Sequence, residues 1–143
     1  MAKYFKTGFN RGVKMKKLFS TKWKSSQNPR KQRKYVVNAP LHIKHKFLGA
    51  HLSKELMTKY KIRSLPLRKE DEVIIKRGSF KGVKGKIEKV LLRRSRVHIA
   101  GAQISKRDGN KVFYPIHPSN VIITELNLKD KERVKVIERR SKK

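Results

Sequence analysis

A glycine-rich loop near the middle of the chain carries the residues whose types and spacing best suit the binding of an anion. Three glycines and four cations share it: Arg77, Gly78, Lys81, Gly82, Lys84, Gly85 and Lys86. Glycine permits positive φ and a close approach of the backbone to a ligand, and lysine and arginine supply charge for phosphate. Apolar runs at residues 73–75 and 87–92 flank the loop and predict a β-hairpin. This hairpin is suited to binding nucleic acid, although its glycines can also serve only the turn.

The charge of the whole chain points to the same class of ligand. Forty Lys and Arg against ten Asp and Glu give a net charge of +30, which demands a polyanionic partner. Nucleic acid is the first candidate and an anionic membrane is the second. No apolar run approaches the roughly 20 residues of a spanning helix, and the cations are spread along the whole chain, so the membrane is disfavoured. With no cysteine, the chain has no disulfide framework.

A group of three histidines suggests a metal site, and this interpretation is disfavoured. His42, His45 and His51 have no cysteine or carboxylate near them before Glu55, so a zinc site is disfavoured against hydrogen bonds to phosphate or backbone. We therefore expect no metal and no cofactor.

The carboxylates of Asp71, Glu72 and Glu88 are the nearest thing to a catalytic pair. An enzyme would need a concave pocket around them, whereas residues 71–126 are expected to form a small β-barrel that is filled by its own side chains. We expect them to pair locally, with Arg68, Lys69 or Lys89. No nucleophile with an adjacent base is evident, and the sequence predicts no enzyme.

The distribution of charge divides the chain into four segments. Residues 1–40 carry 12 Lys or Arg and no acid, and the first acid is Glu55. We predict a basic extended arm over residues 1–39 without a packed core of its own, short helices over 40–70, a β domain over 71–126 and a basic helical tail over 127–143. The arm should be ordered only by its partner.

Helix signals place the elements around the β domain. Asn38 and Pro40 begin a short basic helix that ends near Gly49, and Ser53 caps a second one. Asp130 is a candidate cap for the tail, where residues 134 and 137 are apolar and share one face. Residues 62, 65 and 67 should pack the helical segment against the β domain.

The fold class predicted for residues 71–126 is mainly β. Five short strands are expected at residues 73–75, 87–92, 97–100, 112–116 and 121–123, with turns at 108–110 and 118–120. Their number and spacing indicate a small closed barrel. Ile74 and Ile99 are taken as core residues of this barrel.

Aromatic residues alternate with cations along the arm. They are Tyr4, Phe5, Phe9, Phe19, Trp23 and Tyr35. Stacking on nucleobases beside bound phosphates is one interpretation, and anchoring in a groove of RNA or of a neighbouring protein is another. A mitochondrial targeting segment is disfavoured, because Arg11 is the only arginine before Arg30 and glycines interrupt any helix.

The segment from residue 71 to residue 101 resembles the KOW motif, a strand-loop-strand unit of ribosomal proteins and transcription elongation factors. The flanking motifs choose between these families. They are Asn38-Ala-Pro-Leu-His-Ile43, Leu52-Ser-Lys-Glu-Leu56, Lys59-Tyr60, Ile62-Arg-Ser-Leu-Pro66, Arg68-Lys-Glu-Asp-Glu-Val73, Arg77-Gly-Ser-Phe-Lys-Gly82 and Ile116-His-Pro-Ser-Asn-Val121. Together they resemble the universal large-subunit KOW ribosomal protein family in its eukaryotic and archaeal form (bacterial L twenty-four, eukaryotic L twenty-six).

This resemblance implies a small SH3-like five-stranded barrel and binding to large-subunit ribosomal RNA near the exit of the nascent-chain tunnel. It also implies early entry into subunit assembly, neighbouring large-subunit proteins as partners, and a cytoplasmic ribosomal location with nucleolar passage if the organism is a eukaryote. Residues 1–14 look like an addition before a usual start at Met15, and a longer basic tail than the one ending at Lys143 is expected in many relatives. A KOW module of an elongation factor would be expected beside another domain and with more balanced charge.

The predicted RNA contacts are cations and one histidine spread over the arm, the helical segment and the β domain. They are Arg30, Lys31, Arg33, Lys34, His42, Lys44, Lys46, Lys54, Arg63, Arg77, Lys81, Lys84, Lys86, Arg93 and Arg94. No small-molecule substrate and no membrane insertion are expected.

Overall fold

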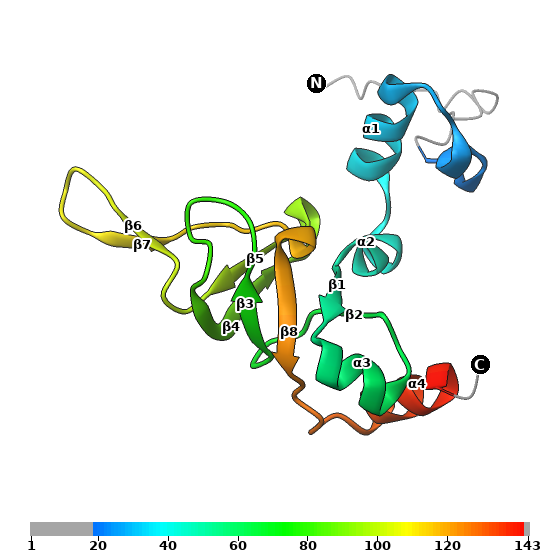
Figure 1. Cartoon of the computed structure of the whole chain (residues 1–143). Helices are drawn as coiled ribbons and strands as arrows, with labels where there is room; N and C mark the ends of the chain where they lie inside the picture. The colour runs from blue at the N-terminus through cyan, green and yellow to red at the C-terminus, as the bar shows by residue number, and fades with distance from the viewer. Residues whose placement is uncertain (1–18, 142–143) are drawn as a thin grey trace, which may run out of the picture. The chain divides into compact units, whose positions relative to one another are not determined.

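The computed structural model describes residues 19–141, without the side chains of residues 23 and 24. The chain divides into two units, residues 1–39 and 40–143, which are described separately (Figure 1). No helix within residues 19–141 is both long enough and apolar enough to cross a membrane.

The described part of the first unit is helical. It contains a 3-10 turn, η1 (Thr21–Ser25), and helix α1 (Pro29–Asn38). The side chain of Asn28 accepts the backbone N–H of Arg30 at 3.0 Å, and Pro29 occupies the first turn, where its missing N–H costs little. The predicted extended conformation is therefore wrong for residues 29–38. The Asn-Pro start signal was present in the sequence, but α1 has no buried residue and hence no apolar stripe to reveal it.

Three helices of the second unit begin where the sequence predicted. They are α2 (Leu41–Phe47), α3 (Lys54–Tyr60) and α4 (Lys131–Ser141). Ser53 caps α3 by accepting the N–H of Leu56 at 3.3 Å, and Asp130 accepts the N–H of Glu132 at 2.8 Å at the start of α4. Helices α3 and α4 lie against each other (Figure 1). Both predicted caps are confirmed.

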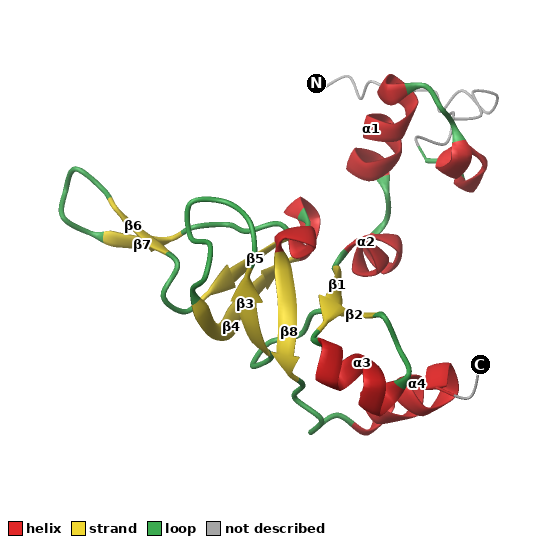
Figure 2. Ribbon diagram, in the orientation of Figure 1, coloured by secondary structure: helices red, strands yellow, loops and turns green. Residues whose placement is uncertain are grey.

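Eight strands make the second unit rich in β structure. They are β1 (Gly49–Leu52), β2 (Ser64–Pro66), β3 (Glu72–Ile75), β4 (Lys84–Leu91), β5 (Arg96–Ile99), β6 (Gln103–Ser105), β7 (Lys111–Phe113) and β8 (Val121–Glu125). Six form one sheet in the order β2-β1-β8-β3-β4-β5, and β6 pairs with β7 in a separate hairpin (Figure 2). Strand β8 runs parallel to β1 and antiparallel to β3.

Four of the five predicted strands are present, and the one expected at residues 112–116 is a strand only over Lys111–Phe113 and pairs with β6. The closed five-stranded barrel is not confirmed. Within residues 19–141 no strand ladder joins the two outer strands of the sheet, β2 and β5. Strands β1 and β2, which the sequence did not predict, extend the sheet beyond β8. Only an isolated bridge from Val97 to Ile116 brings the chain after β7 back to β5.

The core is formed mainly by the strands of the sheet, and helices α3 and α4 add residues to it. Ile99 is fully buried, together with Val73, Ile75 and Ile123, and Ile137 of α4 joins the same cluster. Ile74, predicted as a core residue, is only half-buried. Successive residues of a strand point to opposite faces, so the burial of Val73 and Ile75 turns Ile74 away from this core.

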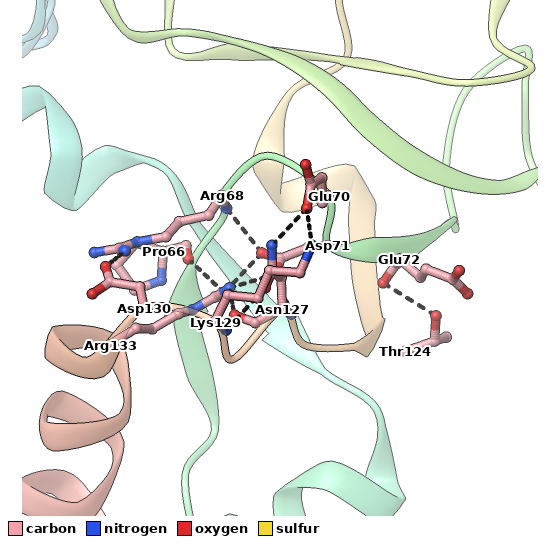
Figure 3. Close-up of polar contacts among 10 residues, drawn as sticks. All are labelled: Pro66, Arg68, Glu70, Asp71, Glu72, Thr124, Asn127, Lys129, Asp130 and Arg133. Atoms are coloured by element: carbon pink, nitrogen blue, oxygen red, sulfur yellow. Dashed lines mark hydrogen bonds and ion pairs between the residues drawn. The ribbon is translucent and has the colours of Figure 1, made fainter.

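A buried ion pair attaches α4 to the start of β3. Asp71 is fully buried and receives both arms of the Arg133 guanidinium, with Nη1–Oδ1 at 2.5 Å and Nη2–Oδ2 at 2.7 Å (Figure 3). It also accepts the backbone N–H groups of Arg68 at 2.8 Å and Asn127 at 3.0 Å. All the lone pairs that burial removes from water are thus satisfied by donors.

The local pairing predicted for these carboxylates is therefore wrong for two of the three. Asp71 pairs with a cation 62 residues away, and Glu72 pairs with Lys86 across the β3–β4 ladder at 3.3 Å. The side chain of Arg68 pairs instead with Asp130. A carboxylate with no exposed surface cannot rely on water to screen its charge, which explains why Asp71 takes a rigid bidentate partner.

Candidate nucleic-acid interface

The loop between β3 and β4 is a tight turn whose backbone is set by two glycines. Gly78 and Gly82 have φ of +98° and +91°, which other L-residues adopt only with strain. The N–H of Lys81 donates to the carbonyl of Gly78 at 3.0 Å, and the N–H of Gly82 donates to that of Ile75 at 2.8 Å. Space around both glycines is open on the side where a Cβ would project, so a ligand can approach the backbone there.

Gly85, predicted as part of this loop, has a different role. It lies inside β4, and a Cβ at this position would stand only 2.1 Å from the carbonyl oxygen of Ala100. The glycine therefore permits the close packing of β4 against the end of β5. Glycine is needed at position 85 for packing inside the fold, whereas Gly78 and Gly82 shape the exposed turn.

The cations around the turn fall into two classes. Arg77 and Lys81 in the turn and Lys84 at the start of β4 are exposed. Lys86 is exposed as well, but its ammonium already lies 3.3 Å from the carboxylate of Glu72. Three of the four predicted cations are thus available for phosphate without breaking an ion pair observed in the described chain.

An aromatic contact holds the turn against the domain. Phe80 packs on the core cluster, and its ring lies 5.4 Å from that of Tyr114, measured between centroids. Phe80 stands between Arg77 and Lys81 in sequence and points inward, so the two cations are carried on an anchored turn. An anchored turn loses less conformational entropy when it binds.

A second group of predicted residues meets at α2 and the 3-10 turn η2 (Leu92–Arg94). Lys44 is buried, and its ammonium donates to the backbone carbonyl of Arg93 at 3.3 Å. This correction to the sequence prediction makes Lys44 a residue that fixes η2 on α2. Arg93, Arg94 and His42 remain exposed.

Helix α1 presents a third group. Arg30, Lys31, Arg33 and Lys34 are all exposed, and the helix contains no acid. Like charges three or four positions apart destabilise a helix. Phosphates placed along α1 would relieve this repulsion.

The last three predicted contacts are Lys54 and Arg63, near α3, and Lys46, on α2. Lys54 is the first residue of α3, and Arg63 lies between α3 and β2. Both are exposed, and neither forms a hydrogen bond or ion pair with another predicted contact in the part of the chain described. Fourteen of the fifteen predicted contacts are exposed, Lys44 being the exception.

The β6–β7 hairpin contains cations that sequence reasoning missed. Its turn is closed by a hydrogen bond from the Lys106 N–H to the Asn110 carbonyl at 2.9 Å, and it stands apart from the six-stranded sheet (Figure 1). Lys106, Arg107 and Lys111 are exposed at its tip. The predicted turn at residues 108–110 is confirmed, and the cations beside it were the signal that could have marked a contact.

The aromatic residues of the arm are only partly described. The rings of Phe19 and Tyr35 lie 4.9 Å apart between centroids, so these two contact each other. Tyr4, Phe5 and Phe9, the added residues 1–14 and the start at Met15 lie outside the described residues. Base stacking by the arm stays a prediction.

The histidines show no arrangement for a metal. Within residues 19–141 there is no group of three His, Cys, Asp or Glu side chains that could hold a metal ion. His98 stacks on Phe113 with centroids 5.7 Å apart, and His117 accepts the N–H of Ser119 at 3.3 Å as it caps a 3-10 turn, η3 (Pro118–Asn120). Burial, and then the charge of Arg96, lower the pKa of His117 below 6.5.

The sequence matches one family of known proteins. The sequence model of the family that unites the eukaryotic ribosomal proteins L26 with their archaeal counterparts of the L24 type matches residues 26–140, which include α1, the whole sheet and most of α4. The glycine turn, the capped helices and the buried pair all lie inside the matched region. The chain therefore belongs to this family of ribosomal proteins, whose members are structural constituents of the ribosome.

Proposed function

We propose that this chain binds large-subunit ribosomal RNA near the exit of the nascent-chain tunnel and supports subunit assembly there. The observation that carries the proposal is the anchored turn at residues 76–83. It presents Arg77 and Lys81, with Lys84 on the adjoining strand, beside a backbone opened by two glycines. Phosphate contacts draw on both cationic side chains and backbone N–H groups.

The mechanism is electrostatic and architectural. Each phosphate neutralised by Lys or Arg releases condensed counterions, which supplies much of the affinity. The folded second unit fixes the turn and η2, while α1 adds cations that gain order from the RNA. The position near the tunnel exit, the neighbouring large-subunit proteins and nucleolar passage rest on family membership and the resemblance of the motifs.

The finer fold assignment is part of the same proposal. We assign strands β3, β4, β5 and β8, with residues 112–116, to the SH3-like barrel of the KOW motif. The Val97–Ile116 bridge and the register shift between β4 residues 87 and 89 support a curved, nearly closed sheet. An experimental structure of the chain on the ribosome would test both the closure and the position.

The RNA contacts can be tested separately from the scaffold. Lys81→Ala with Lys84→Ala should leave the melting temperature nearly unchanged and weaken filter binding to a large-subunit RNA fragment. Ile99→Ala should instead lower the free energy of unfolding by about 2–5 kcal/mol. Parent affinity should fall about 10³-fold or more between roughly 50 and 200 mM salt if six or more phosphates are contacted. A lysine pair that unfolds the domain, or a flat salt dependence, would contradict the proposal.

A further inference from the structure

A groove of about 1090 Å³ opens on the second unit between α2, the outer strand β2, β4 and α4. Its floor is aliphatic, with Pro66, Val90, Leu92 and Val136 half-buried along it. Leucines beneath them are buried, and the described residues that line the groove include no Phe, Tyr or Trp. Exposed apolar surface of this kind in a rim of polar residues marks an interaction site.

The rim of the groove is cationic. Lys69 and Lys89 stand on it with no ion-pair partner among residues 19–141, and Arg140 is held by a 3.4 Å hydrogen bond to the carbonyl of Ser64. Arg68 and Arg133, which also line it, are already paired with acids. Glu88 is the one acid among the described residues of this rim. The rim therefore carries positive charge that its own residues do not balance. An acidic occupant can supply the missing negative charge.

The lining restricts the class of occupant. Single-stranded RNA binds by stacking its bases on aromatic rings or arginine planes beside bound phosphates. The floor of the groove is aliphatic, and its three arginines are already held by Asp130, Asp71 and the carbonyl of Ser64. A second copy of the chain would bring its own charge of +30 to a cationic rim. An occupant with apolar anchors and carboxylates satisfies both the floor and the rim.

We propose that this groove docks an acidic, amphipathic segment of another protein. Its apolar side chains would cover Val90, Leu92 and Val136, and its carboxylates would face Lys69 and Lys89. Neither lysine belongs to the RNA contacts proposed above, although Lys46, which also lines the groove, is one of them. The groove is thus a protein-binding surface beside an RNA-binding one, and it goes beyond the proposed function.

The test uses the full chain and a synthetic labelled peptide of about four helical turns. Its leucines recur at i, i+3, i+4 and i+7 and its other face is glutamate. A matched peptide has every leucine replaced by serine. Binding is followed by fluorescence anisotropy with the parent, with Lys69→Glu/Lys89→Glu, and with Lys106→Glu/Lys111→Glu as a control of equal net charge on the β6–β7 hairpin.

The proposal expects the leucine peptide to bind the parent and the serine peptide to bind at least about tenfold more weakly. Reversing Lys69 and Lys89 should lower the affinity by about tenfold or more, and the hairpin control should change it by less than about threefold. Val136→Ser, at a half-buried position, should weaken only the leucine peptide.

Three results would overturn the inference. Equal binding of both peptides, or equal losses in the two charge-reversed variants, would mean attraction by net charge alone. A large-subunit RNA fragment that loses affinity in the Lys69→Glu/Lys89→Glu variant as strongly as the peptide would assign the groove to RNA. Normal RNA binding by that variant, together with no peptide binding by the parent, would reject the groove and leave the proposed function standing.

Discussion

Helices α1 and α4 have almost the same proportion of cations, but they differ in how far their side chains are buried. Helix α1 has four Lys or Arg in ten residues, no acid and no buried residue. Helix α4 has five Lys or Arg in eleven residues, but it also has Glu132 and Glu138 and buries Arg133 and Ile137. The first is a helix of exposed charge, and the second is part of the folded core.

The difference lies in the partners provided for each charge. Arg133 meets Asp71, Lys135 meets Glu132 at 2.9 Å, and Ile137 enters the hydrophobic cluster. Helix α1 contains no acid of its own to play these roles. In α4, a basic segment is thus part of a folded core because a buried acid and an apolar face are supplied for it.

The largest expected effect comes from removing the buried partner. Arg133→Ala should lower the free energy of unfolding by about 3–5 kcal/mol, because it leaves the Asp71 carboxylate buried without a cation. Arg133→Lys should lose part of this, since an ammonium cannot reproduce the two parallel hydrogen bonds. Urea denaturation would measure both.

The exposed Glu72–Lys86 pair is the control for that change. Lys86→Ala should cost less than about 1 kcal/mol, because water and salt screen an exposed pair. If Arg133→Ala were equally mild, α4 would be held by its apolar contacts alone.

The second effect separates the apolar faces of the two helices. Ile137→Ala should destabilise the second unit by about 2–5 kcal/mol, because only 4% of its surface is exposed. Val37→Ala in α1 should change stability by less than about 0.5 kcal/mol, because Val37 is 70% exposed. Thermal melts of both variants give the comparison, and a large effect of Val37→Ala would show that α1 has a protein partner.

The third effect concerns binding. Arg30→Ala with Arg33→Ala should leave the melting temperature unchanged and reduce the slope of log affinity against log salt by about two. Amide exchange in the free protein should be fast in residues 29–38, with opening costing roughly 1 kcal/mol or less, and should slow when RNA is added. Protection in the free protein equal to that of residues 73–123 would contradict this account.

The smallest effect depends on pH, and neither helix contributes to it because neither contains a histidine. Burial and Arg96 lower the pKa of His117 below 6.5 in the folded protein. Below pH 6.5 the unfolded chain therefore binds more protons at this site, and stability is lost as pH falls from 6.5 towards the lowered pKa. His117→Asn should remove this part of the pH dependence in melts between about pH 7 and pH 5. An unchanged profile would mean that another group titrates.

Local signals in the sequence identified much of the fold. The caps at Ser53 and Asp130 and the turns at residues 108–110 and 118–120 are properties of a few neighbouring residues, and all were predicted. The strands at residues 73–75 and 97–99 followed from apolar runs and alternation. These elements need no knowledge of distant partners.

What the sequence could not supply depends on long-range contacts. Strands β1 and β2 are short, and β1 is a strand because it pairs with β2 on one side and, on the other, with β8, about 70 residues later. The partner of Asp71 was equally hidden, since any nearby cation was a more obvious choice. For the candidate site, the RNA contacts stay a prediction, and the inward role of Lys44 and the packing role of Gly85 appear only in three dimensions.

The Asp71–Arg133 pair also limits how early the domain can finish folding during its synthesis. A ribosome adding about 5–20 residues per second needs roughly 3–12 s to make the 62 residues that separate the two partners. The six-stranded sheet cannot be completed early either, because β8 lies between β1 and β3 and is the last of its strands to be made. Until β8 is made, one edge of β1 and one edge of β3 are unpaired. Until Arg133 is made, the Asp71 carboxylate remains hydrated. The domain thus completes its fold only after Arg133 has been made, well after synthesis of the turn at residues 76–83 to which we assign RNA binding.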